Sequence, residues 1–134
     1  MAPKRKVELP QRHPDALIVD RASFIEKLNE RLHLSKLFLE KQITNVPELE
    51  GLEKEYHKWD NYNSEYLKQS FNNEDNTYKT SYDRVNDWLG GFGTNKYDSS
   101  PQSRFQKLRD KISNKTESIE RLVENAELLK SDIG

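Results

Sequence analysis

The sequence predicts an all-α fold, a helical bundle of about four helices with a long C-terminal heptad helix. The first observation is composition, because 33% hydrophobic and 34% charged residues leave little material for a thick core. The second is a mean hydropathy of -1.05, which suits long helices with one buried stripe. The third is that apolar residues recur at steps of three and four between clusters of helix-breaking residues.

The chain of 134 residues has the length of one domain, and no linker divides it. Residues 1–15 hold three of the five prolines and the basic run Lys4-Arg5-Lys6, so we expect a flexible tail there. The basic run is similar to a nuclear import signal, but such short runs are common in solvated tails. Residues 16–134 are expected to form a single helical domain, in which the apolar residues 16–19 either lie against the bundle or form an isolated extended piece.

The first helix is predicted to begin near Asp20 or Ser23 and to end near Ile43. Its apolar positions recur at helical spacing and are Phe24, Leu28, Leu32, Leu39 and Ile43. Three further apolar residues, Leu34, Leu37 and Phe38, widen this stripe. Because a wide stripe suits a helix with several neighbours, we expect this helix at the centre of the bundle.

The second helix has a clear start, because Asn45 can cap it, Pro47 suits its first turn and Glu48 complements the helix dipole. An aromatic stripe follows at steps of three and four, formed by Leu49, Leu52, Tyr56, Trp59, Tyr62, Tyr66 or Leu67, and Phe71. Such stripes are more often core than ligand cage. The indole and phenol groups are expected to reach water or a polar partner.

A shorter third helix is predicted after the polar break at residues 72–76, on the pattern Tyr78, Tyr82, Val85 and Trp88 or Leu89. A glycine-rich loop, residues 90–100, then precedes the last helix. No strand precedes these glycines and no Gly-Lys-Ser/Thr closes them, which argues against a phosphate-binding loop.

The last helix carries the most regular pattern, a narrow heptad stripe that we call the heptad seam. Its members are Phe105, Leu108, Ile112, Lys115, Ile119, Leu122, Ala126 and Leu129. One interpretation is packing along the first helix within the same domain, and the other is self-association in a dimer. Lys115, the one polar member, would fix the register of an assembly or reach solvent by snorkelling.

Several functional classes are disfavoured by composition. The 22 basic residues nearly balance the 23 acidic ones, so no global field attracts nucleic acid. The absence of cysteine excludes disulfides and thiolate sites, and no apolar run approaches the length of a membrane span. The histidines His13, His33 and His57 form no metal pair. We therefore expect a cytoplasmic protein that is not an enzyme, with no catalytic, cofactor-binding or metal-binding residue and no membrane partner.

The segment Val46 to Phe71 resembles the helical N-terminal domain that precedes predicted nucleotide-binding, TIR-like effector domains in bacterial antiphage defence proteins. The tract W-x-x-Y-N-x-x-L-L-x-x-x-F of that family is matched by Trp59, Tyr62, Asn63, Leu67 and Phe71. Its closing heptad helix is matched by the run from Phe105 to Leu129, so the resemblance spans about residues 17 to 130. In the family, the TIR-like domain follows where this chain ends at Gly134.

The resemblance implies no catalytic residue in this portion and agrees with the residue-level interpretation. We expect a regulatory or oligomerising module that acts by helix-mediated protein association, either with itself or with an attached effector domain. The alternative is a recognition module that binds a phage protein, a nucleotide or nucleic acid through the aromatic helix and the glycine-rich loop. Nucleic acid is the least expected of these partners.

Overall fold

The computed structural model describes residues 15–90 and 100–133, and the predicted tail and most of the glycine-rich loop lie outside these ranges. The described residues confirm the all-α bundle. Its helices are α1 (Arg21–Glu40), α2 (Val46–Ser70), α3 (Thr77–Arg84) and α4 (Pro101–Glu124), with the 3-10 turns η1 (Asp87–Gly90) and η2 (Ala126–Leu128).

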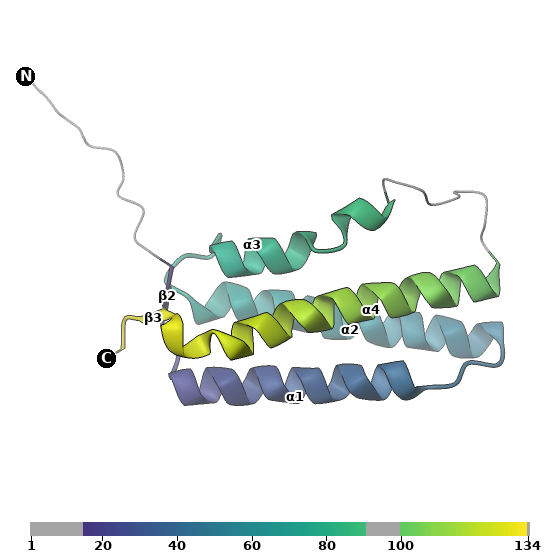
Figure 1. Cartoon of the computed structure of the whole chain (residues 1–134), viewed down its shortest axis with the longest axis horizontal. Helices are drawn as coiled ribbons and strands as arrows, with labels where there is room; N and C mark the ends of the chain where they lie inside the picture. The colour runs from purple at the N-terminus through teal and green to yellow at the C-terminus, as the bar shows by residue number, and fades with distance from the viewer. Residues whose placement is uncertain (1–14, 91–99, 134) are drawn as a thin grey trace, which may run out of the picture.

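The helices α2 and α4 lie in the middle of the bundle, with α1 on one side and α3 on the other (Figure 1). Both middle helices contact each other and both outer helices. The predicted central position of the first helix is therefore wrong. Its widened stripe is the reason, because Leu37 is exposed and Leu34 and Phe38 are only partly buried.

The helices α1 and α4 are antiparallel, and one arginine at each end of the pair makes a hydrogen bond between their segments. The Arg21 guanidinium donates to the carbonyl oxygen of Ala126, and Arg109 Nη1 donates to the carbonyl oxygen of Leu39 at 2.7 Å. The Leu39 carbonyl lies in the last turn of α1, where carbonyls lack intrahelical donors, so Arg109 satisfies a group that the helix leaves open. The Ala126 carbonyl lies in η2 and also accepts from the Leu129 N–H at 3.2 Å. Both contacts set the register of α1 against α4.

The start of α2 is capped as predicted. The side chain of Asn45 accepts a hydrogen bond from the backbone N–H of Glu48 at 2.9 Å. The Glu48 carboxylate in turn accepts from the backbone N–H of Thr44 at 2.8 Å. This reciprocal arrangement satisfies two orphan donors and lowers the pKa of Glu48, with the Thr44 backbone bond as the largest cause.

A small sheet joins the two ends of the described chain (Figure 1). The strand β2 (Ala16–Leu17) pairs in parallel with β3 (Lys130–Ser131), and Leu17 also forms an antiparallel bridge with Phe71. Ala16 and Leu17 are buried, which confirms that this part of the apolar patch packs against the bundle, whereas Ile18 is exposed. Both ends of the described chain therefore lie at one end of the bundle.

Candidate functional site

The heptad seam lies inside the bundle formed by this chain. Seven of its eight residues are buried and Phe105 is partly buried, against the other helices of the same chain. Packing within the domain is thus the arrangement present in the structure. The helix is also shorter than the seam, because α4 ends at Glu124, Ala126 lies in η2 and Leu129 follows it.

Lys115 neither faces an open surface nor reaches solvent by snorkelling. Its side chain is 5% exposed, with Nζ 3.3 Å from Asp60 Oδ1. The ammonium also donates to the carbonyl oxygen of Tyr82 at 2.8 Å. Asp60 Oδ1 is buried without a well-aligned hydrogen bond, so its contact with Lys115 is mainly ionic. A charge inside the bundle is tolerated here because it has a partner.

Lys115 belongs to a buried network that we call the polar cluster, formed by Arg31, Asp60, Asn63, Tyr82 and Lys115. Asn63 accepts from Arg31 Nε at 2.7 Å and donates to the Tyr82 hydroxyl at 2.9 Å. The Lys115 ammonium lies 4.1 Å from the centre of the Tyr82 ring. These residues come from α1, α2, α3 and α4, so the polar cluster connects all four helices.

The electrostatics of the polar cluster favour a structural role. Burial, followed by the nearby charge of Asp60, raises the pKa of Tyr82 above its ordinary value. Burial lowers the pKa of Arg31 from its usual value, opposed by neighbouring groups that include Tyr62. A neutral, hydrogen-bonded phenol in the interior is a poor acid or base near neutral pH. The arrangement holds helices together and brings no nucleophile to a surface.

Sequence reasoning missed Arg31, Asp60 and Tyr82 as members of this cluster. A signal for Arg31 was present, because it lies three residues after Leu28 and therefore on the apolar stripe of α1. A charged residue on such a stripe indicates a buried partner elsewhere in the chain. Asp60 and Tyr82 carried no comparable signal, since only the fold brings them to Lys115.

The aromatic tract is core with one exception. Trp59, Asn63, Leu67 and Phe71 are buried, and the Trp59 indole donates to the carbonyl oxygen of Arg31 at 2.9 Å, which confirms the expected polar partner. Tyr62, by contrast, is 43% exposed, so its predicted core position is wrong.

The position of Tyr62 follows from the pitch of α2. Trp59 and Asn63 are four residues apart and share the inward face, which leaves Tyr62 at its edge. Its ring lies under two cations, with the Arg31 guanidinium 4.1 Å and the Lys27 ammonium 5.5 Å from the ring centre.

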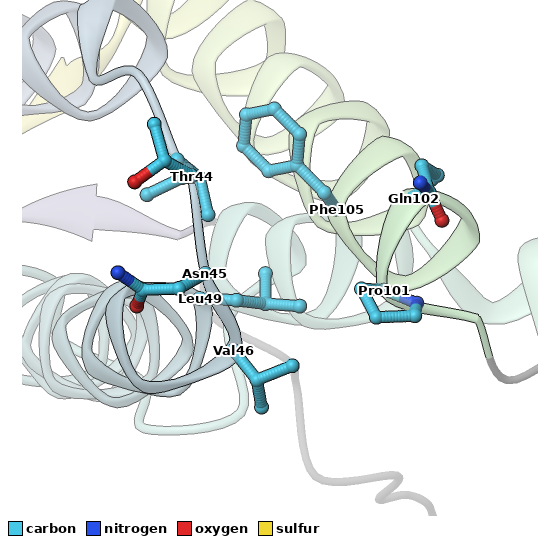
Figure 2. Close-up of a pocket in the computed structure, with 8 residues that line it drawn as sticks. Thr44, Asn45, Val46, Leu49, Pro101, Gln102 and Phe105 are labelled. Carbon is cyan, nitrogen blue, oxygen red and sulfur yellow. The ribbon is translucent and has the colours of Figure 1, made fainter.

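A groove opens where the α1–α2 loop meets the start of α4 (Figure 2). It encloses about 330 Å³, and its apolar lining includes Val46, Leu49, Pro101 and Phe105. Of the polar lining residues, Asn45 already caps α2. Small-molecule sites need polar groups placed to orient a ligand, and this groove offers few that are uncommitted.

A second apolar feature surrounds the small sheet, and we call it the strand-end surface, formed by Ile18, Leu128 and Ile133. All three side chains are exposed, Leu128 to 80%. The strands hold these segments together, since Asp132 N–H donates to the carbonyl oxygen of Leu17 at 2.9 Å. Large apolar side chains gathered at one end of a small domain are a common feature of protein contacts.

Within residues 15–90 and 100–133, no three His, Asp or Glu side chains are grouped as a metal site would require. Over the same residues, no helix has the length and apolar character that crossing a membrane requires. His33 and His57 are exposed on α1 and α2.

No protein-family model matches the chain, and no curated protein or solved structure matches it at a significant level. The fold and site therefore define a structural class, a four-helix bundle closed around an internal polar cluster. Beyond this class, the resemblance of the α2 tract and the closing helix to the TIR-associated helical domain stays a sequence-based expectation.

Proposed function

We propose that this chain is a non-catalytic oligomerisation module of a bacterial, TIR-like antiphage defence protein, acting in the cytoplasm by protein association. In this proposal, self-association occurs at the strand-end surface and brings attached effector domains together. The tract around Trp59 and the closing helix support the family assignment. The exposed side chains of Ile18, Leu128 and Ile133 support the choice of the strand-end surface.

The observation that carries the proposal is the contrast between two apolar surfaces. The heptad seam is buried by the chain's own helices, so association through it would require the bundle to open. The strand-end surface is exposed in the closed bundle. A domain joined to either terminus would be tethered near this end, because β2 and β3 are paired there.

The experiment is sedimentation across a concentration series of the wild type, Leu128→Glu and Leu37→Glu. Leu37 is a matched control, since it is also an exposed leucine but lies on α1 away from the small sheet. We expect the wild type and Leu37→Glu to show a mass that rises with concentration. Leu128→Glu should remain monomeric, because a buried unpaired carboxylate opposes association. A wild type that is monomeric throughout contradicts the proposal.

A recognition function is the second candidate, and the exposed ring of Tyr62 is the observation that favours it. Lys27 and Arg31 flank this ring, which gives a small basic and aromatic patch. Most of the glycine-rich loop in the alternative lies outside the described residues. Titration with a single-stranded oligonucleotide tests the nucleic-acid form of this function: wild-type binding that Tyr62→Ala abolishes would support it, and no wild-type binding would contradict it.

A further inference from the structure

The helix α3 is attached to the bundle much less extensively than the other helices. It has eight residues, and Tyr82 is its one buried side chain. By comparison, α1, α2 and α4 each bury several apolar residues. A helix of eight residues is not stable in isolation. Its helical state therefore depends on docking against α2 and α4.

The docking of α3 combines two aromatic contacts, the fully buried ring of Tyr82 and the stacking of Tyr78 on Phe71 at 4.8 Å between ring centres, with several polar contacts. Lys115 Nζ donates to the carbonyl oxygens of Tyr82 and Asp83 at 2.8 and 3.4 Å, in the last turn of α3. The Tyr82 carbonyl also accepts from the backbone N–H of Val85 at 3.4 Å, so the buried ammonium adds a second donor at the C-terminal end of α3. The Tyr82 hydroxyl adds its bond from Asn63 at 2.9 Å. Removing one of these contacts should weaken the docking of α3 and leave the contacts between α1 and α4 in place.

The residues between α3 and η1 are also held by polar side-chain contacts with α4. The Asn86 amide donates to the carbonyl oxygen of Lys111 at 3.1 Å and accepts from Asn114 at 3.0 Å. Before α3, by contrast, the fully buried Asn76 donates to the carbonyl oxygen of Leu67 at 3.0 Å. The chain is thus anchored at Asn76, and the more weakly packed part begins with α3.

We propose that residues 77–90, which comprise α3 and η1 and which we call the α3 segment, form a detachable unit that opens as a whole from the α2–α4 face. The hydrogen bonds that Asn63 and Lys115 of the polar cluster donate to Tyr82 hold this unit in the closed position. Opening would uncover Asp60, Asn63 and Lys115 together with the apolar residues beside them on α2 and α4. Any ligand that binds this uncovered face would shift the equilibrium towards the open form.

This conformational device is independent of the proposed self-association. The α3 segment shares no residue with the strand-end surface, although the Thr77 N–H donates to Asp15, beside β2, at 2.7 Å. The opening of this segment leaves the α1–α4 pair in place. The fastening of that pair by Arg21 and Arg109 involves no residue of α3. Local units of this kind open with a lower free energy than the whole domain.

The test is native-state hydrogen exchange of the wild type, followed for single amides at rising urea concentrations below the unfolding transition. We expect the amides of α3 to exchange at least about tenfold faster than the best-protected amides of α2 and α4, with a weaker urea dependence. Amides of α3 that follow the same urea dependence as those of α2 and α4, and show equal protection, would overturn the proposal.

Two variants sharpen the test. Tyr82→Phe removes one hydroxyl and its hydrogen bonds, and should raise exchange in α3 by roughly tenfold. The same contact is lost in global unfolding, so amides of α1 and α2 that exchange by global unfolding should accelerate by the same factor. Leu28→Ala is the control, because Leu28 is buried on α1, on the opposite side of the bundle (Figure 1). It should accelerate exchange by global unfolding and leave the opening of α3 as it was. Acceleration of α3 equal to that of α2 in Leu28→Ala, or exchange of α3 that Tyr82→Phe leaves unchanged, would overturn the detachable unit.

Discussion

Lys115, the one polar residue in the heptad seam, determines how that pattern is interpreted. In a heptad stripe, a single lysine is typical of either an assembly that selects its register or a side chain that reaches water. In the structure it pairs with Asp60 and donates to the C-terminal end of α3, so its charge serves the interior of one chain. The pattern predicted an inward position correctly. It carried no information on the partners, because they come from α2 and α3.

The two aromatic residues Trp59 and Tyr62 provide a test of burial at the residue scale. Trp59→Ala should lower the free energy of unfolding by about 3–5 kcal/mol, because a large ring leaves a cavity in a packed core. Tyr62→Ala should cost less than about 1 kcal/mol, since its ring is 43% exposed and it loses mainly a cation–π contact with Arg31. Urea unfolding of both variants measures the difference. Similar losses of unfolding free energy in the two variants would contradict the division of the tract into a buried Trp59 and an exposed Tyr62.

The buried tyrosines predict a loss of stability at alkaline pH. Burial, followed by the charge of Asp60, raises the pKa of both Tyr56 and Tyr82 above the ordinary value of 10.0. The unfolded chain therefore loses these protons near pH 10, while the folded protein keeps them. The stabilisation that these two phenols contribute is complete below pH 10, and it is lost as the pH rises through their raised pKa values in the folded protein.

Urea unfolding from neutral pH to about pH 11 checks this expectation, with Tyr56→Phe and Tyr62→Phe compared. Tyr56→Phe should flatten the alkaline decline, because one shifted group is removed. Tyr62→Phe should retain the wild-type slope, since its ring is exposed. A stability that stays constant above pH 10 in the wild type would contradict the burial of these phenols.

At the scale of elements, local signals predicted the start of α2 better than the end of α1. Asn45, Pro47 and Glu48 are adjacent in sequence and act locally, so the start at Val46 followed from them. The predicted end of the first helix near Ile43 is three residues too long. Near Glu40 the carbonyl oxygen of Leu39 accepts from Arg109 of α4, a contact that no local pattern contains.

The cap of α2 gives the prediction at this scale. Asn45→Ala removes the side-chain acceptor for the Glu48 N–H and should cost about 1 kcal/mol of unfolding free energy. Asn61→Ala is the matched control, because Asn61 is exposed in the interior of α2 and alanine favours helix there. Urea midpoints of the two variants are compared. An equal effect on both would mean that the cap contributes nothing.

For the whole molecule, the sequence predicted the helices and the class of fold, but not their arrangement. The width of the α1 stripe suggested a central helix, although α2 and α4 occupy the centre. The small sheet was also beyond prediction, because β2 and β3 come from opposite ends of the chain. The polar cluster needs all four helices at once, and only the assembled bundle creates it.

The measurement that tests the account most directly is the urea unfolding of Lys115→Leu at several protein concentrations. If the heptad seam is the interior of one bundle, the change leaves the buried Oδ1 atom of Asp60 without its ionic partner and removes a donor from the C-terminal end of α3. We predict a loss of about 3–5 kcal/mol that is the same at every concentration. A gain in stability that grows with concentration would show that the seam joins separate chains, and would contradict the account.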